Sequence, residues 1–170
     1  MESQLKAQKS FDDGRYELMN GNFGKSIERF SEALRLDPEH KLALVSRGSA
    51  FLKLNSIGEA IKDFDRVIDI DPNYARAYHL RGIAKEKGRD NQSALDDISK
   101  AIELDPEYGA AYHSRATLLT KMKKEDLALV DIEMVHVLTN RNIETFANEN
   151  NIWRSQQLRL ESILESDLAR

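Results

Sequence analysis

The sequence predicts an all-α protein, a solenoid of four stacked helix pairs closed by a long C-terminal capping helix. Two observations predict this fold class. The three prolines, Pro38, Pro72 and Pro106, are each 34 residues apart, and each follows an aspartate. Small and large apolar residues recur at the same period. A period of this length is typical of solenoids in which each repeat is one helix pair.

The composition fits one folded domain. The 170 residues are 41% hydrophobic and 32% charged, with a formal net charge of −4. A chain of this length and apolar content can bury its own core. The mildly acidic balance predicts no nucleic-acid partner. No run reaches the roughly 18 apolar residues of a membrane span and no signal peptide is present, so we expect a cytoplasmic protein.

The prolines divide the chain into four units, 7–40, 41–74, 75–108 and 109–142, within one domain that continues to residue 170. Position 8 of each unit holds Gly14, Gly48, Gly82 or Ala116, and position 20 holds Ser26, Ala60, Ala94 or Ala128. Two helices approach closely only where side chains are short, so these positions are expected to face each other. In the fourth unit Asn140 replaces the proline.

The same period predicts where the helices lie. Apolar residues at positions 20, 21, 24, 27 and 28 fall on one face of a helix with 3.6 residues per turn. Each Asp-Pro pair should end one helix and begin the next, with the aspartate as N-cap. The first helices are expected over 3–20, 39–54, 73–88 and 107–122, and the second helices over 24–36, 57–70, 91–104 and 125–138.

The segment 143–170 is predicted to be the cap. The last unit of a solenoid leaves an apolar face bare. Extending the period places Phe146 and Trp153 at positions 4 and 11 of an incomplete fifth unit, and Leu160 continues their apolar face. We expect one helix over about 142–168 that docks on the fourth unit. The alternative is that this tail reaches a neighbouring molecule and forms a dimer.

Opposite charges occupy positions 7 and 23 of every unit. Units two to four carry arginine and then aspartate, whereas the first unit reverses the signs. Pairing across units would set Arg29 against Arg47, so the two positions are expected to face each other within one unit. The predicted structural pairs are Asp13–Arg29, Arg47–Asp63, Arg81–Asp97 and Arg115–Asp131. The alternative is that these arginines bind the carboxylate of a ligand.

The sequence carries no pattern for catalysis, and we predict no catalytic residues, no cofactor and no metal. It has no cysteine, no glycine-rich phosphate loop and no nucleophile elbow. Two of its histidines, His79 and His113, share position 5 one unit apart. Equivalent atoms of stacked units lie on the order of 10 Å apart, too far for one zinc ion with bonds of about 2.0–2.1 Å.

The repeated pattern resembles the tetratricopeptide repeat family over roughly residues 7–142. The resemblance rests on the period, the small residues at positions 8 and 20, the large apolar residue at position 24 and the proline. It implies a right-handed α-solenoid that binds other proteins and is not an enzyme. The first unit departs from the family at position 4, where Ser10 replaces a bulky residue.

In this family the first helices line a concave groove through positions 2, 5, 9 and 12. The resemblance therefore implies that a peptide or helix of a partner protein binds there. The residues implied are Phe11, Arg15, Leu18, Leu42, Val45, Ser49, Leu52, Arg76, His79, Ile83, His113 and Thr117. The first two units supply apolar side chains and the third supplies basic ones, which suits a partner with apolar anchors and an acidic end.

Other interpretations of the same pattern remain open. The chain could be a self-associating scaffold joined through its ends or its C-terminal helix, or its groove could be filled by its own tail. A monomer and a weak dimer are both compatible with the sequence. One subset of the family clamps chaperone tails with lysine at position 5 and asparagine at position 9 of the first unit. Phe11 and Arg15 stand there, so this ligand is not implied.

Overall fold

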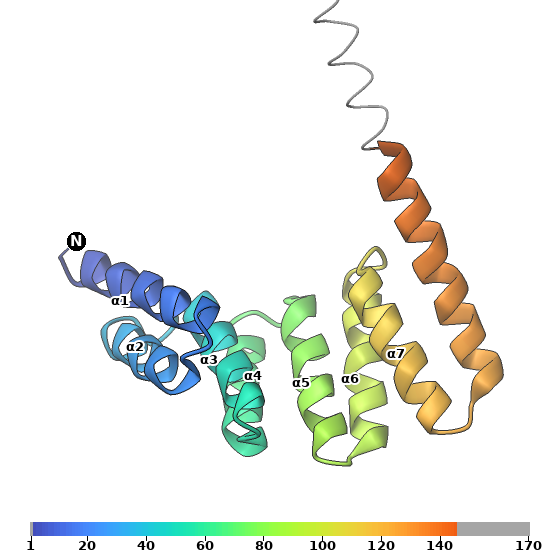
Figure 1. Cartoon of the computed structure of the whole chain (residues 1–170), viewed down its shortest axis with the longest axis horizontal. Coiled ribbons are helices and arrows are strands. Elements are labelled where there is room, and N and C mark those ends of the chain that lie inside the picture. The colour runs from blue at the N-terminus through green and yellow to red at the C-terminus, as the bar shows by residue number, and fades with distance from the viewer. Residues whose placement is uncertain (1, 146–170) are drawn as a thin grey trace, which may run out of the picture.

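The computed structural model describes residues 2–145, which form a row of helix pairs stacked side by side (Figure 1). The helices are α1 (Glu2–Met19), α2 (Phe23–Leu36), α3 (Lys41–Lys53), α4 (Ile57–Ile70), α5 (Ala75–Lys87), α6 (Asn91–Leu104), α7 (Gly109–Lys121) and a last helix over 125–145. The predicted all-α stack of four helix pairs is confirmed. Within these residues no helix is both long and apolar enough to cross a membrane.

The Asp-Pro pairs end the second helices, but they do not begin the next helices as predicted. The backbone N–H of His40 donates to the carbonyl of Asp37 at 3.2 Å and closes a turn between α2 and α3. His40 then caps α3, because its Nδ1 accepts from the N–H of Ala43 at 3.2 Å. The same turn recurs at Tyr74 and Tyr108. Helices α3, α5 and α7 therefore begin two residues later than predicted.

The last helix departs most from the prediction. It was expected to end at residue 138, before a separate capping helix from about 142, yet it runs unbroken over 125–145. The stop signal is missing, because Asn140 stands where the other units have proline. Residues 142–145 therefore continue the second helix of the fourth unit without a break. The predicted cap residues Phe146, Trp153 and Leu160 lie outside the described residues.

The two helices of a pair approach most closely at the small residue of position 8. A Cβ built on Gly48 would lie 2.7 Å from the ring of Phe64, and one built on Gly14 would lie 2.6 Å from the ring of Phe30. Both rings are fully buried. The ring of the second helix thus occupies the space that a side chain on the first helix would need.

Two glycine substitutions test this close approach. Changing Gly48 to alanine is expected to lower the free energy of unfolding by about 1–3 kcal/mol, because the methyl group overpacks against Phe64. A Cβ added to Gly58, in α4, would meet no atom within 4 Å. Gly58→Ala should instead raise the free energy of unfolding by up to about 1 kcal/mol. Urea denaturation measures both, and equal effects at the two sites would contradict the packing argument.

Candidate protein-binding surface

Three of the four predicted charge pairs form, and they tie the units together. The Nε and Nη2 atoms of Arg47 donate to both carboxylate oxygens of Asp63 at 2.8 and 2.7 Å. Its Nη1 atom donates to the hydroxyl of Ser31 in the preceding unit at 2.9 Å. Arg115 repeats this arrangement with Asp131 and with Ser99. Each arginine therefore joins its own unit to the one before it.

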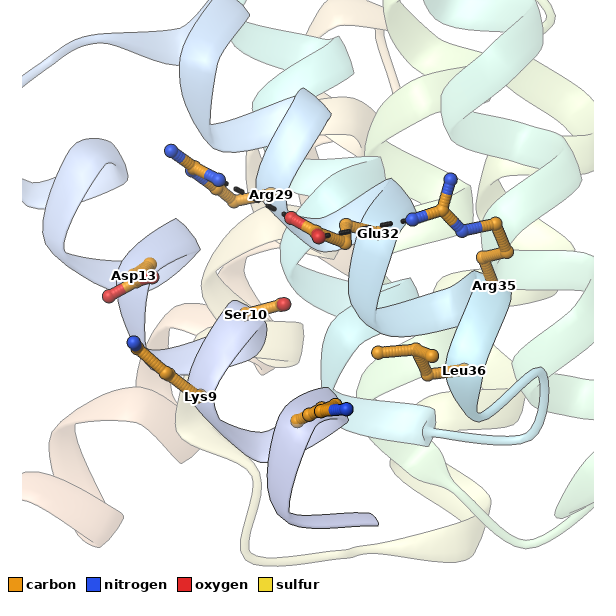
Figure 2. A pocket seen from close by; sticks show the side chains of 8 residues that line it. Lys9, Ser10, Asp13, Arg29, Glu32, Arg35 and Leu36 are labelled. Carbon is orange, nitrogen blue, oxygen red and sulfur yellow. Dashed lines mark hydrogen bonds and ion pairs between the residues drawn. The ribbon is translucent and has the colours of Figure 1, made fainter. Parts of the chain in front are cut away.

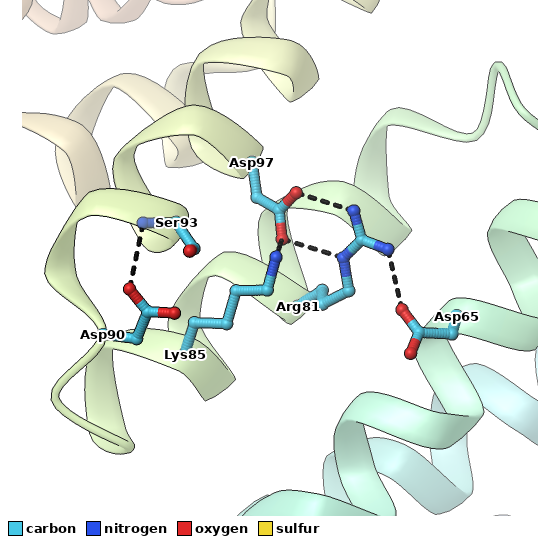
Figure 3. A network of polar contacts seen from close by, with 6 residues as sticks. All are labelled: Asp65, Arg81, Lys85, Asp90, Ser93 and Asp97. Atoms are coloured by element: carbon cyan, nitrogen blue, oxygen red, sulfur yellow. Dashed lines mark hydrogen bonds and ion pairs between the residues drawn. The ribbon is translucent and has the colours of Figure 1, made fainter.

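The central pair forms the most extensive network (Figure 3). Arg81 donates to Asp97 at 2.8 and 2.7 Å and to Asp65 of the preceding unit at 2.7 Å. Lys85 also contacts Asp97 at 2.7 Å, and the guanidinium lies 5.4 Å from the ring centre of Tyr78. The hydrogen bonds to Asp97 raise the pKa of Arg81 above its ordinary value. All three guanidinium nitrogens of Arg81 are thus engaged within the protein.

Each of these arginines has a second partner, at position 25 of the preceding unit, which the sequence analysis did not predict. It is Ser31, Asp65 or Ser99, one unit before each arginine. The period contained the signal, since this position is polar in every unit.

The fourth predicted pair, Asp13–Arg29, does not form. Among the described residues no ion pair joins these two side chains, and Arg29 instead contacts Glu32 at 3.3 Å (Figure 2). The other arginines lie on first helices and reach the second helix of the preceding unit. The first unit has no preceding unit in the described chain, and its arginine is on α2 with 53% of its side chain exposed. Solvent weakens such a pair.

The helices α1, α3, α5 and α7 contact one another in order along the row. Positions 2, 5, 9 and 12 of the four units, which were predicted to line a groove, are called here the binding face. Leu42 is 50% exposed on it. The other predicted residues that are exposed are Arg15, Arg76, His113 and Thr117, and those that are half-buried are Leu18, Ser49, Leu52 and Ile83. Nine of the twelve predicted groove residues thus reach the surface.

The other three predicted groove residues are buried, so their assignment to a binding surface is wrong. Phe11, Val45 and His79, all at position 5, are only 5%, 3% and 5% exposed. The residue that precedes the next first helix packs close to them. This residue, at position 34, is His40 in the first unit, Tyr74 in the second and Tyr108 in the third. The ring of Phe11 lies 4.8 Å from that of His40, and His79 lies 5.0 Å from Tyr108 between ring centres.

His79 is a neutral link between units three and four. Its Nδ1 and Nε2 atoms lie 3.0 Å from the hydroxyl of Tyr108 and 2.8 Å from that of Ser114. Burial, with a contribution from Arg76, lowers the pKa of His79 to about 4. It therefore adds no positive charge to the binding face near neutral pH. His113 stays exposed at the same position, where the fourth unit has Asn142 at position 34.

The last helix carries a second surface that the sequence analysis missed. Positions 19, 22, 26 and 29 are polar in the first three units and apolar in the fourth. We call these four residues the outer stripe: Leu127, Val130, Met134 and Val137, which are 57%, 62%, 36% and 51% exposed. Leu127 and Val130 also line a shallow groove with Leu95 and Leu119. Within residues 2–145 no three side chains gather in a way that would hold a metal ion.

Comparisons with known proteins place the chain in a family. Two models described as tetratricopeptide repeat match residues 11–75 and 75–108, together more than half of the sequence. Comparison with curated protein sequences finds no match.

Solved structures of low identity share the fold. The MamA fragment from Desulfovibrio magneticus RS-1 is 22% identical, with a TM-score of 0.73, and the match covers 79% of this chain and 76% of that one. The Arabidopsis OM64 TPR domain is 23% identical, with a TM-score of 0.68 over 70% of this chain and 98% of that one. The first TPR of Spaghetti (RPAP3), bound to an HSP90 peptide, is 21% identical, with a TM-score of 0.67 over 71% and 95%. The chain belongs to the tetratricopeptide repeat family, whose members are usually non-enzymatic scaffolds for protein interaction.

Proposed function

We propose that this chain is an adaptor whose binding face holds an extended or helical segment of a partner protein. The observation that carries the proposal is Leu42, an apolar side chain half exposed on that face. Leu18 and Leu52 lie half-buried on the same face. Apolar side chains displayed on a rigid scaffold gain free energy when a partner covers them.

The charges around these leucines indicate the chemistry of the partner. Arg15 and Arg76 are exposed on the binding face, and Lys53 and Lys87 are exposed at position 13 beside it. The chain as a whole carries a net charge of −4, so this cationic set is local. A segment with apolar anchors and acidic side chains complements both features. Acidic residues would also raise the association rate at low salt.

A related structure supports the acidic character of the ligand. The RPAP3 domain was solved with the HSP90 peptide SRMEEVD, which contains two glutamates and an aspartate. Phe11 and Arg15 stand in this chain where the chaperone-tail clamp has lysine and asparagine. We therefore propose an acidic partner segment other than a chaperone tail.

Peptide selection tests this function. A displayed library of random peptides is selected on the full chain, and we expect enriched sequences that combine acidic residues with leucine or aromatic anchors. The affinity of the best peptide is then measured for the double variant Leu42→Asp, Arg76→Glu, and a loss of at least about tenfold is expected. The control is Lys62→Glu, the same kind of charge change on exposed α4. Equal losses in both variants, or enrichment of basic peptides, would refute the proposal.

A further inference from the structure

Among residues 2–145, nothing covers the face of the last helix on which a next unit would stack. At position 24 the first three units carry Phe30, Phe64 and Ile98, all fully buried. The equivalent Ile132 is 52% exposed. Leu129, at position 21, is 62% exposed, and Ile143 on the same face is 60% exposed. At positions 21 and 24 this face has the composition of a core surface, because these positions are buried or half-buried in the other units.

The residues on this face follow the spacing of a helix-pairing seam. We define the seam as Leu129, Ile132, His136, Thr139 and Ile143, which are separated by alternating steps of three and four residues. Such steps keep side chains along one side of a helix that packs against another helix.

The opposite end of the row cannot cover the seam. Where α3 meets the preceding unit, positions 3, 4 and 11 are Ala43, Leu44 and Phe51, whereas α1 has Lys9, Ser10 and Glu17. Charged side chains of α1 and α2 line the pocket at this end (Figure 2). They are Lys6, Lys9, Asp13, Arg29, Glu32 and Arg35. Stacking copies head to tail would bury these charges against Ile132, at a cost of several kcal/mol.

The shape of the last helix favours a second copy instead. It extends beyond the N-terminal end of α7 (Figure 1), and residues 139–145 are all exposed. The rest of the fourth unit therefore does not cover the distal part of the seam. Leu129 and Ile132 at one end of the seam and Ile143 at the other are apolar and exposed, and the opposite end of the row does not complement them. Two copies related by a twofold axis can bury them in a closed contact.

We propose that two copies of this chain pair through the seam of their last helices and form a twofold dimer. The seam shares no residue with the binding face, so this inference stands apart from the proposed adaptor function. A dimer would present two binding faces and bind a partner with repeated segments more tightly by avidity.

Light scattering on the full chain at several concentrations tests the pairing. A dimer is expected for the unmodified chain and a monomer for the double variant Ile132→Glu, Ile143→Glu. Carboxylates in the seam should raise the dimer dissociation constant at least about a hundredfold, because they would be buried without partners. Both positions are more than half exposed within one chain, so the monomer fold should not change. Circular dichroism checks that helix content is retained.

The matched control is Val130→Glu, Val137→Glu on the outer stripe, which is exposed to a similar extent on the same helix. This variant is expected to remain a dimer. An unmodified chain that is monomeric at every concentration would overturn the proposal, as would a dimer that survives the seam substitutions. Dissociation by the outer-stripe variant alone would also overturn it and would assign the contact to the outer stripe.

Discussion

Replacing Arg47 by methionine is expected to lower the free energy of unfolding by about 3–5 kcal/mol. Asp63 is 3% exposed, and both of its oxygens accept hydrogen bonds from Arg47. Removing the guanidinium leaves a buried carboxylate without its cation, and it also breaks the link to Ser31 in the preceding unit. Methionine keeps much of the aliphatic stem, so the loss reports the charge and its hydrogen bonds. Urea denaturation provides the measurement.

Two related substitutions serve as comparisons for Arg47→Met. Arg81→Met should cost less than Arg47→Met, because Lys85 still contacts Asp97 at 2.7 Å after Arg81 is removed. Arg29→Met should change the free energy of unfolding by less than about 1 kcal/mol, because its contact with Glu32 is exposed. The reverse order, with Arg29→Met the most damaging, would show that the buried pairs do not hold the units together.

Acidification is expected to remove up to about 3 kcal/mol of stability through His79 alone. Its pKa is about 4 in the folded chain against an ordinary value of 6.5. The unfolded chain therefore binds more protons than the folded chain between these values. The contribution of the neutral imidazole is fully present above pH 6.5 and is lost as the pH falls from 6.5 to about 4.

A matched pair of variants isolates this contribution. The free energy of unfolding is measured at pH 7 and at pH 4.5 for the unmodified chain, for His79→Gln and for His113→Gln. His113 occupies the same position of the next unit but is exposed. We expect His79→Gln to have a smaller drop between the two pH values, and His113→Gln to match the unmodified chain. If the free energy of unfolding fell by the same amount in all three proteins, protonation of His79 would carry no cost in stability, which would contradict this account.

The period predicts most of the fold because each repeated position has one packing role. Gly48 is small in the sequence because Phe64 fills its space in the structure. The helices α1 to α7 accordingly lie within two residues of their predicted ranges. The end of the last helix was predicted wrongly. In the other units a proline ends the second helix, and the fourth unit has Asn140 in its place.

The site was harder to predict because exposure depends on neighbouring units. Position 5 lies on a first helix in every unit, yet Phe11 is buried and His113 is exposed. Aromatic side chains such as His40 close over this position in the first three units, and the fourth unit lacks one. The predicted pair of Arg29 with Asp13 is wrong for the same reason, because their unit has no preceding unit among the described residues. The period can be read from the sequence, whereas contacts between units can be read only from the three-dimensional structure of the stack.

The central claim is that the partner segment binds across the first helices. Photo-crosslinking tests it most directly, with a photoreactive amino acid placed at Leu42 on the binding face, at Lys62 on α4 or at Val130 on the outer stripe. The probe is the acidic peptide obtained by selection on the full chain. We predict that the peptide becomes attached to the chain labelled at position 42 and not to the chains labelled at positions 62 or 130. Attachment only at position 62 or 130 would contradict the account.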